Sequence, residues 1–337
     1  MAIGDHLTTF QVKNFKGFDD LEVKNLGWVN LIVGDNNVGK TSLLEALHFH
    51  ADARSGVDAF RERLITILQE VRGVTNLRSF FLDVFVNRAK AQLPEGVDMF
   101  FRMTHKVRAE AVYSLTYAGG KIGKQQFIND GKAVKSVIRN NNGPVSTVAL
   151  PYIPVNRGYG PDLVSNYSIH IQQNVSLRHQ LLEDLRILIP ELKSFEPSEI
   201  MQPSTIILFL KDTESSIPLP LMGEGTIKLF RILSEILVWK GQRLMIDEID
   251  TGFHHSRMRP FWKTILTAAR RHETQLFVTT HNLECIQHLK HTLQEDMPEF
   301  QDEVRVLRLA RVQSGVKAYT YTYPEFESAI DNENELR

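Results

Sequence analysis

The stretch from Gly34 to Thr41 has the residue types and spacing that hold a chain of phosphates. It reads GDNNVGKT, matches the pattern G-x-x-x-x-G-K-[ST], follows an apolar run and precedes a helical pattern. Glycines let successive backbone N–H groups converge on phosphate oxygens, and a helix N-terminus adds a favourable dipole. Lys40 would reach the β- and γ-phosphates, and the Thr41 hydroxyl would ligate Mg²⁺. The expected contacts are Gly34, Asp35, Asn36, Asn37, Val38, Gly39, Lys40, Thr41 and Ser42.

Two carboxylates end a second apolar run, RLMIDEID, at Asp247 and Glu248. Successive side chains of a strand point to opposite faces, so the two groups can take different roles. Asp247 would hold Mg²⁺, and Glu248 would polarise the attacking water of a phosphoryl transfer. The alternative is an acidic strand end that only caps the next helix, and the phosphate-binding pattern upstream makes it the weaker interpretation.

A histidine, His281, ends the next apolar run, QLFVTTH. Ligands of open α/β sheets bind at the carboxyl ends of the strands, which is where this residue is expected. An imidazole there could contact a γ-phosphate, although a lone histidine can also be structural. We therefore predict Glu248, His281 and Lys40 as catalytic residues, with Thr41 and Asp247 as metal ligands.

The elements around these residues follow from hydrophobic periodicity. In the first half we expect strands over 7–15, 20–25 and 28–33, a helix after Gly39, and helices over 57–71 and near 80–85. We also expect an antiparallel sheet through 99–130, turned at Gly119 and Gly120. Leu177, Leu181, Leu185 and Leu188 line one face of a further helix that Pro190 stops.

In the second half, predicted strands alternate with predicted helices. Strands are expected over 204–210, 243–246 and 275–280, and helices over 229–237, 258–269 and 283–293. This alternation implies parallel sheet with right-handed crossovers. A closing hairpin over 303–323 turns at Ser314 and Gly315, and the acidic end of the chain reads as a last helix and a solvated tail.

Together these motifs resemble the ABC-type ATPase heads of the RecF, SMC and OLD group, and above all the compact AAA-type ATPases with an OLD-like ATP-binding domain from bacterial anti-phage defence systems. The resemblance covers nearly the whole chain and is carried by GDNNVGKTS, TTFQVKNFKGF, YIPVNRG, PLMGEGTIKLFRIL, LMIDEIDTGFHHS, LFVTTHNLECI and LRLARV with GVKAYTYTY.

The fold that this resemblance implies is α/β, a P-loop NTPase of ABC-ATPase type. Its mixed and parallel sheet would be flanked by helices, with an antiparallel β subdomain and a short helical insertion. The chain would form a single domain, 1–337. Its parts would be an N-terminal lobe with the P-loop (1–55), an insertion (56–203, with a short helical arm at 172–190), and a C-terminal lobe (204–337) with the signature-like, Walker B, D-loop and His-switch elements.

The resemblance also implies that ATP is sandwiched between two protomers. The helix start MGEG, with Gly223 and Gly225, would face the γ-phosphate held by the other protomer. Asp250 and His254 would belong to the loop that crosses the dimer interface, and Lys16 in NFKGF would contact phosphate or base.

The chain departs from the family pattern at two places. Met222 stands where a signature serine is usual, and Glu224 replaces the second glycine, so the serine's hydroxyl contact is missing. The glutamine that usually joins metal and water has no clear counterpart, and its candidates are Gln125, Gln126, Asn156 and Arg157.

Composition limits the kinds of partner, such as nucleic acid or a membrane, that the protein is expected to bind. The 39 basic and 40 acidic residues give a formal net charge of −1, so no global field draws the protein onto nucleic acid. The arginines at 257, 259, 270 and 271 form either solvated faces or a local DNA-backbone patch. No run is apolar enough for a membrane span, and no secretion signal is seen, so a cytoplasmic location is expected.

We therefore expect a slow Mg²⁺-dependent ATPase whose ATP-driven homodimerisation, with higher oligomers as a further option, senses a trigger and controls a partner effector in anti-phage defence. Too few residues follow the last ATPase element for a nuclease domain, so a nuclease or toxin should be a separate protein. One alternative is a RecF-like repair ATPase that binds DNA. The other is a nucleotide-dependent scaffold with little hydrolysis.

Overall fold

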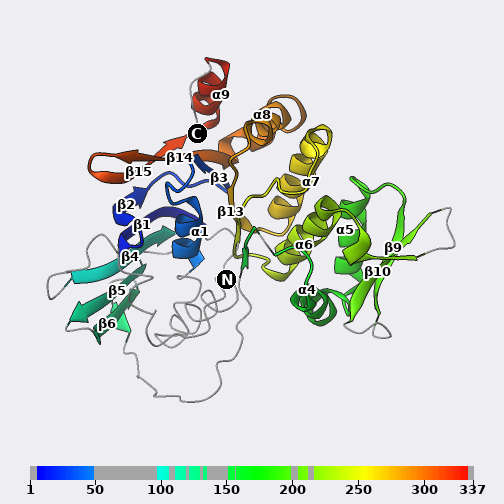
Figure 1. The fold of residues 1–337 in the computed structure, drawn as a ribbon, viewed down its shortest axis with the longest axis horizontal. Helices are drawn as coiled ribbons and strands as arrows, with labels where there is room; N and C mark the ends of the chain where they lie inside the picture. The colour runs from blue at the N-terminus through cyan, green and yellow to red at the C-terminus, as the bar shows by residue number, and fades with distance from the viewer. Residues whose placement is uncertain are drawn as a thin grey trace. The chain divides into compact units, whose positions relative to one another are not determined.

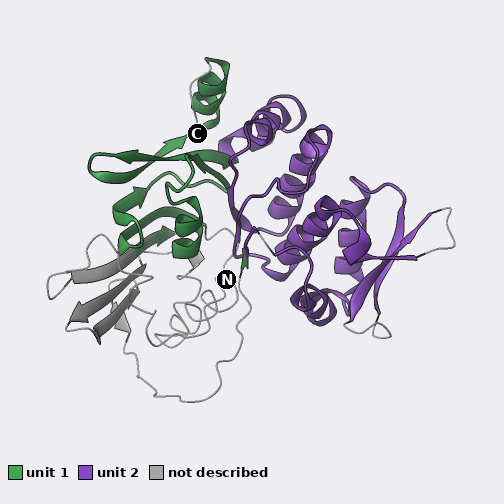
Figure 2. Ribbon diagram, in the orientation of Figure 1, with its two compact units in different colours: residues 1–152, 304–337 green, residues 153–303 purple. Residues whose placement is uncertain are grey.

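A computed structural model of the 337-residue chain describes residues 6–48, 97–105, 111–118, 121–129, 132–134, 151–155, 157–198, 204–211 and 216–332. The chain divides into two compact units, residues 1–152 with 304–337 and residues 153–303 (Figure 2). The C-terminal strands belong to the first unit because they pair with its strands. This division differs from the expected lobes 1–55, 56–203 and 204–337, whose boundaries stay a prediction.

The first unit contains an antiparallel sheet with the strand order β2-β1-β4-β5-β6-β7. The strands are β1 (Leu7–Phe15), β2 (Phe18–Val23), β4 (Val97–His105), β5 (Ala111–Ala118), β6 (Lys121–Asn129) and β7 (Lys132–Val134). Each neighbouring pair is antiparallel, which confirms the antiparallel sheet expected through 99–130.

The same unit carries the strand that leads into the phosphate-binding pattern. This strand, β3 (Val29–Gly34), is buried along its whole length and pairs in parallel with β14 (Val304–Val312). β14 turns back antiparallel into β15 (Gly315–Tyr321), which confirms the predicted closing hairpin. The helix α1 (Lys40–His48) follows β3, and the predicted last helix is α9 (Tyr323–Asp331), which begins with a capping box of Thr322 and Glu325 (Figure 1).

The second unit contains a βαβ element that confirms the predicted alternation. β12 (Arg243–Ile246) and β13 (Gln275–Thr279) are parallel and joined through α7 (Met258–Arg271). α6 (Glu224–Val238) precedes β12, and α8 (Leu283–His291) follows β13 (Figure 1). The indole of Trp262 on α7 donates to the carbonyl of Cys285 on α8 at 3.0 Å, so these two helices share a buried hydrogen bond.

The strand predicted over 204–210 forms, but its place in a parallel sheet was wrong. This strand, β10 (Thr205–Leu210), pairs antiparallel with β9 (Leu192–Ser198) and β11 (Ser216–Pro218) in a separate sheet. The short connections on both sides of β10 explain this, because parallel neighbours need a crossover of a dozen or more residues.

Short helices complete the second unit. They are α4 (Pro161–Asn166), the π-helices η3 (Tyr167–Ile171) and η6 (Thr292–Asp296), α5 (Val175–Arg186), and the 3₁₀ turns η4 (Leu219–Leu221), η5 (His255–Arg257) and η7 (Pro298–Glu303). The two-residue strand β8 (Tyr152–Ile153) lies at the boundary of the two units in the sequence. α5 lies within the predicted arm 172–190. Leu181 and Leu185 are buried as expected, as is Leu188 just after the helix, whereas Leu177 is half-buried. The helices predicted over 57–71 and near 80–85 lie outside the described residues.

Candidate functional site

The phosphate-binding pattern forms a loop with the backbone that its sequence requires. Three residues take positive φ angles, Gly34 at 139°, Asn37 at 61° and Gly39 at 117°. A Cβ on Gly34 would lie 2.3 Å from the Leu309 carbonyl oxygen, and one on Gly39 would lie 2.9 Å from the Phe18 ring. Both glycines are therefore needed by close packing as well as by conformation.

Lys40 lies at the start of α1 with its side chain over this loop. Its ammonium donates to the carbonyls of Gly34 at 2.8 Å and Asp35 at 3.1 Å. Asp35, Asn36 and Asn37 are exposed, while Thr41 and Ser42 are half-buried. An exposed loop that ends in a helix N-terminus and a lysine fits the phosphate chain of a nucleotide.

Lys16, the predicted nucleotide contact, forms an ion pair with Glu45 of α1. The Glu45 side chain is 1% exposed and that of Lys16 is 15% exposed. Lys16 follows β1 directly and adopts a positive φ of 49°. The residue therefore joins β1 to the phosphate-loop helix, and its contact with nucleotide stays a prediction.

In the second unit, two threonines at the end of β13 position the carboxylates that follow β12. The Thr279 hydroxyl donates to Asp247 Oδ1 at 2.6 Å and accepts from the Glu248 N–H at 2.8 Å. The Thr280 hydroxyl donates to Asp250 Oδ1 at 2.6 Å. Sequence reasoning missed both threonines, although two hydroxyl residues directly before a strand-end histidine were a readable signal.

Glu248 and His281 are in direct contact. His281 Nδ1 lies 2.5 Å from Glu248 Oε2, and Glu248 has a positive φ of 49°. The Glu248 side chain is 19% exposed and that of His281 is 62% exposed, so both can be reached from solvent. A carboxylate beside an imidazole at a strand edge can hold and move a proton of bound water.

The helix start MGEG lies against the loop after β12. A Cβ on Gly225 would lie 2.5 Å from the Gly252 carbonyl oxygen, so the two backbones touch here. Gly223 is the N-cap of α6. Among the described residues, no side chain caps this helix end and none would meet a Cβ on Gly223. His254 Nδ1 lies 2.9 Å from the Ser256 hydroxyl within the following turn. An uncapped, open helix N-terminus can receive a phosphate.

A buried lysine of α6 also lies at this carboxylate cluster. Lys228 is 4% exposed and donates to the backbone carbonyl of Asp247 at 3.2 Å. Burial lowers the pKa of Lys228 to about 8, against the opposing attraction of Asp247, Asp250 and Glu248. The sequence analysis did not single out this residue.

Four residues were candidates for the glutamine that joins metal and water in the family pattern, and they lie in different parts of the chain. Gln125 and Gln126 lie on β6, opposite Leu115 and Ser114 of β5. Asn156 lies outside the described residues. Arg157 forms an ion pair with Asp162 at 3.1 Å.

The four arginines considered as a DNA patch all have partners within the protein. Arg259 contacts Glu295 at 2.6 Å and Asp296 at 2.5 Å. Arg270 contacts Glu303 and Arg271 contacts Asp184, at 3.5 and 2.9 Å. Arg257 donates to the Leu188 carbonyl at 3.2 Å. Three of the four charges are thus already balanced by carboxylates.

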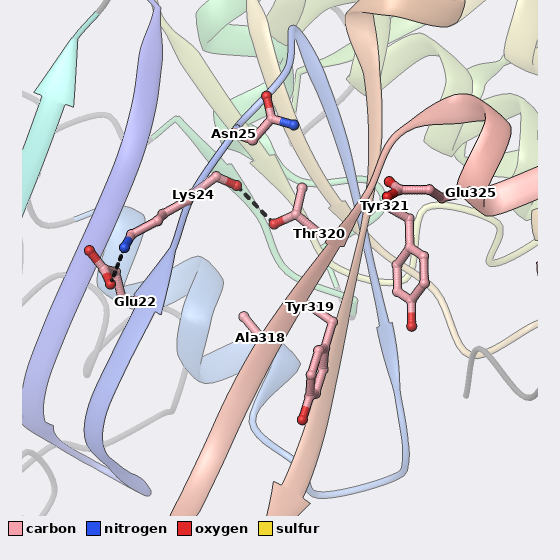
Figure 3. A pocket seen from close by; sticks show the side chains of 8 residues that line it. All are labelled: Glu22, Lys24, Asn25, Ala318, Tyr319, Thr320, Tyr321 and Glu325. Atoms are coloured by element: carbon pink, nitrogen blue, oxygen red, sulfur yellow. Dashed lines mark hydrogen bonds and ion pairs between the residues drawn. The ribbon is translucent and has the colours of Figure 1, made fainter.

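A separate pocket of about 610 Å³ lies beside β15 in the first unit. Figure 3 shows Lys24, Tyr319 and Glu325 among its lining residues. Glu22 pairs with Lys24 at 2.9 Å, and the Thr320 hydroxyl donates to the Lys24 carbonyl at 2.8 Å. The lining includes none of the predicted site residues. None of the helices in the described part of the chain has the length and apolar character to cross a bilayer.

Comparison with known proteins agrees with this geometry. Residues 6–94 match the family described as AAA ATPase domain, and residues 149–286 match that described as AAA domain, putative AbiEii toxin, Type IV TA system. An ATP/GTP phosphatase of Helicobacter pylori is 22% identical over 98% of this chain and 99% of its own length. A DNA replication and repair protein RecF of Symbiobacterium thermophilum is 44% identical, over 15% of this chain and 13% of its own.

Solved structures show the same fold. The SMC head domain from Thermotoga maritima aligns with a TM-score of 0.54 at 12% identity, over 94% of this chain and 99% of that one. An SMC head bound to the C-winged helix domain of ScpA aligns with a TM-score of 0.60 at 11% identity, over 97% of this chain and 99% of that one.

Proposed function

Because this chain is an ABC-type ATPase of the RecF and SMC group, with the P-loop NTPase fold, we propose that Mg²⁺-dependent ATP binding and hydrolysis drive its dimerisation. Through this dimerisation the protein senses a trigger and controls a partner effector in anti-phage defence. The observation that carries the hydrolytic part is the contact of Glu248 with His281 beside an Asp247 carboxylate that Thr279 orients.

In this proposal the loop from Gly34 to Ser42 binds the phosphates of ATP. Lys40 exchanges its two carbonyl partners for β- and γ-phosphate oxygens, which are stronger acceptors because they are charged. Thr41 and Asp247 would hold Mg²⁺, since hydroxyl and carboxylate oxygens are the ligands that this cation prefers. The metal would supply charge stabilisation for the transferred phosphoryl group.

Glu248 is the proposed general base for the attacking water. Its carboxylate accepts the water's proton, and His281 holds that carboxylate in place and contacts the γ-phosphate. Positioning and charge stabilisation dominate phosphoryl transfer, so turnover stays slow until a ligand improves the geometry.

We propose that the N-terminus of α6 contacts the second protomer. Gly223 and Glu224 are exposed, and Leu221 just before them is 76% exposed, the largest exposed fraction among the large apolar side chains of the described residues. An apolar side chain left in water beside an open helix N-terminus supports a surface that another copy covers on ATP binding. Met222 and Glu224 supply no signature serine, so backbone N–H groups would make the phosphate contacts.

The defence role rests on the resemblance and on the family matched by residues 149–286, which is described by a putative toxin of a toxin–antitoxin system. The effector would be a separate nuclease or toxin. The RecF matches favour the alternative of a DNA-binding repair ATPase, but they cover only short parts of the chain. The acidic partners of Arg259, Arg270 and Arg271 speak against a DNA patch on α7.

The test compares the parent protein with Glu248→Gln in ATP and Mg²⁺. Phosphate release should fall by about 10²–10³-fold because the general base is lost, while light scattering should show a stable dimer. Glu299→Gln, at an exposed site on η7, is the matched control and should behave like the parent. A Glu248→Gln protein that releases phosphate at the parental rate, or stays monomeric with ATP, contradicts the corresponding half of the proposal.

A further inference from the structure

The N-terminal half of α6 carries a buried cation, Lys228, that faces the carboxylates after β12. Its ammonium donates to the Asp247 carbonyl at 3.2 Å, and the residue is 4% exposed. A buried ammonium is costly unless opposite charge lies close. Asp247, Asp250 and Glu248 supply that charge, since each of them attracts the ammonium.

The other buried cation of α6 is committed elsewhere. Arg231 is 1% exposed and pairs with Asp162 at 2.7 Å and Glu235 at 3.4 Å, and its Nε donates to the Gly158 carbonyl at 2.6 Å. Its guanidinium therefore fixes α6 to α4 and to the segment just before α4. Lys228 is therefore the buried cation of α6 whose charge interacts with the three carboxylates after β12.

The neighbouring hydroxyl groups cannot balance this charge. Thr279 and Thr280 each donate one hydrogen bond, to Asp247 and Asp250, and a hydroxyl orients a carboxylate without neutralising it. Two of these carboxylates, Asp247 and Asp250, are 5% and 8% exposed, so water screens them little. The lysine thus contributes both a charge and a fixed point for the end of β12.

We propose that Lys228 is a positioning residue of ATP hydrolysis, whose ammonium ties α6 to the end of β12 and balances the carboxylates of Asp247, Glu248 and Asp250. This inference rests on the proposed roles of Asp247 and Glu248. Lys228 lies on the same helix as Gly223 and Gly225, about one turn further on. The same helix therefore links the proposed phosphate contact at its N-terminus to the residues proposed to hold metal and water.

Lys228→Met tests this because it keeps the length of the side chain and removes its charge. The turnover number for ATP should fall about tenfold or more, with KM for ATP within about twofold, because the change acts on positioning rather than on nucleotide binding. Removing a cation near a metal ligand should at the same time tighten divalent-cation binding by about three- to tenfold. Electron paramagnetic resonance of free Mn²⁺ measures this change in cation affinity. The protein is loaded with a slowly hydrolysed ATP analogue, so the measurement does not depend on turnover.

Two variants serve as controls. Lys228→Arg keeps the charge and should recover most of the turnover number lost in Lys228→Met. Lys290→Met removes another buried lysine of the second unit, on α8, and should change neither turnover nor Mn²⁺ affinity. If Lys228→Met fails to fold, Lys228→Met with Asp250→Asn restores the charge balance and should recover the melting temperature.

The outcomes separate this inference from the proposed function. A parent protein that releases no phosphate from ATP contradicts the ATPase proposal itself. A parent that turns over, together with a Lys228→Met protein of parental turnover and Mn²⁺ affinity, overturns only the role of Lys228. Weaker Mn²⁺ binding in Lys228→Met, or a double variant no more stable than the single one, also overturns it, because either result assigns the lysine to general packing.

Discussion

His281 Nδ1 and Glu248 Oε2 lie 2.5 Å apart, so the predicted phosphate sensor and the predicted general base are in direct contact. The two residues come from the ends of neighbouring parallel strands, β13 and β12. A carboxylate held this way loses rotamer freedom before the reaction, which lowers the entropic cost of reaching the reactive geometry. In the proposed mechanism, this pair would join the contact with the γ-phosphate to the activation of water.

The first prediction concerns His281→Ala. Turnover of ATP should fall by about 10²-fold because Glu248 loses its orienting partner and the γ-phosphate loses a contact. The KM for ATP should change little, since the loop from Gly34 to Thr41 supplies the ground-state binding. Steady-state phosphate release measures both constants, and His179→Ala, an exposed histidine on α5, is the control. Turnover within twofold of the parent would contradict the role of His281.

The second prediction concerns Thr279→Val, which keeps the shape and removes the hydroxyl. The Asp247 carboxylate and the Glu248 N–H both lose a hydrogen bond in a buried site, which should cost about 1–3 kcal/mol of stability. The Mg²⁺ concentration for half-maximal activity should rise as well, because Asp247 is no longer oriented.

Thr279→Ser should restore both properties, since it keeps the hydroxyl. Thr274→Val is the matched control for burial, because the Thr274 hydroxyl bonds to the Ile236 carbonyl. It should lose stability and keep the parental Mg²⁺ dependence. Equal Mg²⁺ dependence in Thr279→Val and the parent would show that the hydroxyl does not position the metal ligand.

The sequence predicted individual helices and strands well where the residues of the element itself determine its secondary structure. β1 spans the predicted residues, and α7 begins at the predicted Met258, because strand alternation and helical periodicity are properties of a short window. The partner of a strand is not such a property. β10 was expected in a parallel sheet, and its short links to β9 and β11 decide otherwise.

The site shows the same division. The loop around Lys40 and the pair Asp247 and Glu248 could be recognised because consecutive residues carry their chemistry. Lys228 could not be recognised in this way, because only the fold shows that this lysine of an apolar helix contacts the end of β12. Lys16 was predicted to contact nucleotide, and only the fold reveals its ion pair with the buried Glu45.

The third prediction concerns that ion pair. Lys16→Met removes the cation beside a carboxylate that is 1% exposed, and should cost about 2 kcal/mol or more of unfolding free energy. Adding Glu45→Gln should recover much of the loss, because the buried negative charge is then also gone. Lys13→Met breaks an exposed pair with Asp20 at 2.8 Å and should cost less than about 1 kcal/mol.

Urea unfolding measures these differences, and nucleotide affinity provides the second readout. A Lys16→Met protein of parental stability with a raised KM for ATP would show that Lys16 acts on the nucleotide instead of on Glu45.

The fourth prediction concerns stability in acid and depends on His272, the C-cap residue of α7. Burial, reinforced by the positive charges of Arg271 and Lys240, lowers the pKa of this imidazole to about 4. The unfolded chain, with a pKa of about 6.5, then binds the proton more tightly than the folded chain. Between these two values stability must therefore rise with pH, and it is lost as the pH falls from about 6.5 to about 4.

His272→Leu removes this titration, and the buried Nε2 has no hydrogen-bond partner to lose in the part of the chain that the structure describes. The variant should gain stability relative to the parent as the pH falls, by up to about 3 kcal/mol near pH 4. Urea unfolding at several pH values between 4 and 7 measures the difference, and His179→Leu, exposed on α5, should show none. A constant difference between His272→Leu and the parent over this range would mean that His272 keeps an ordinary pKa in the folded protein.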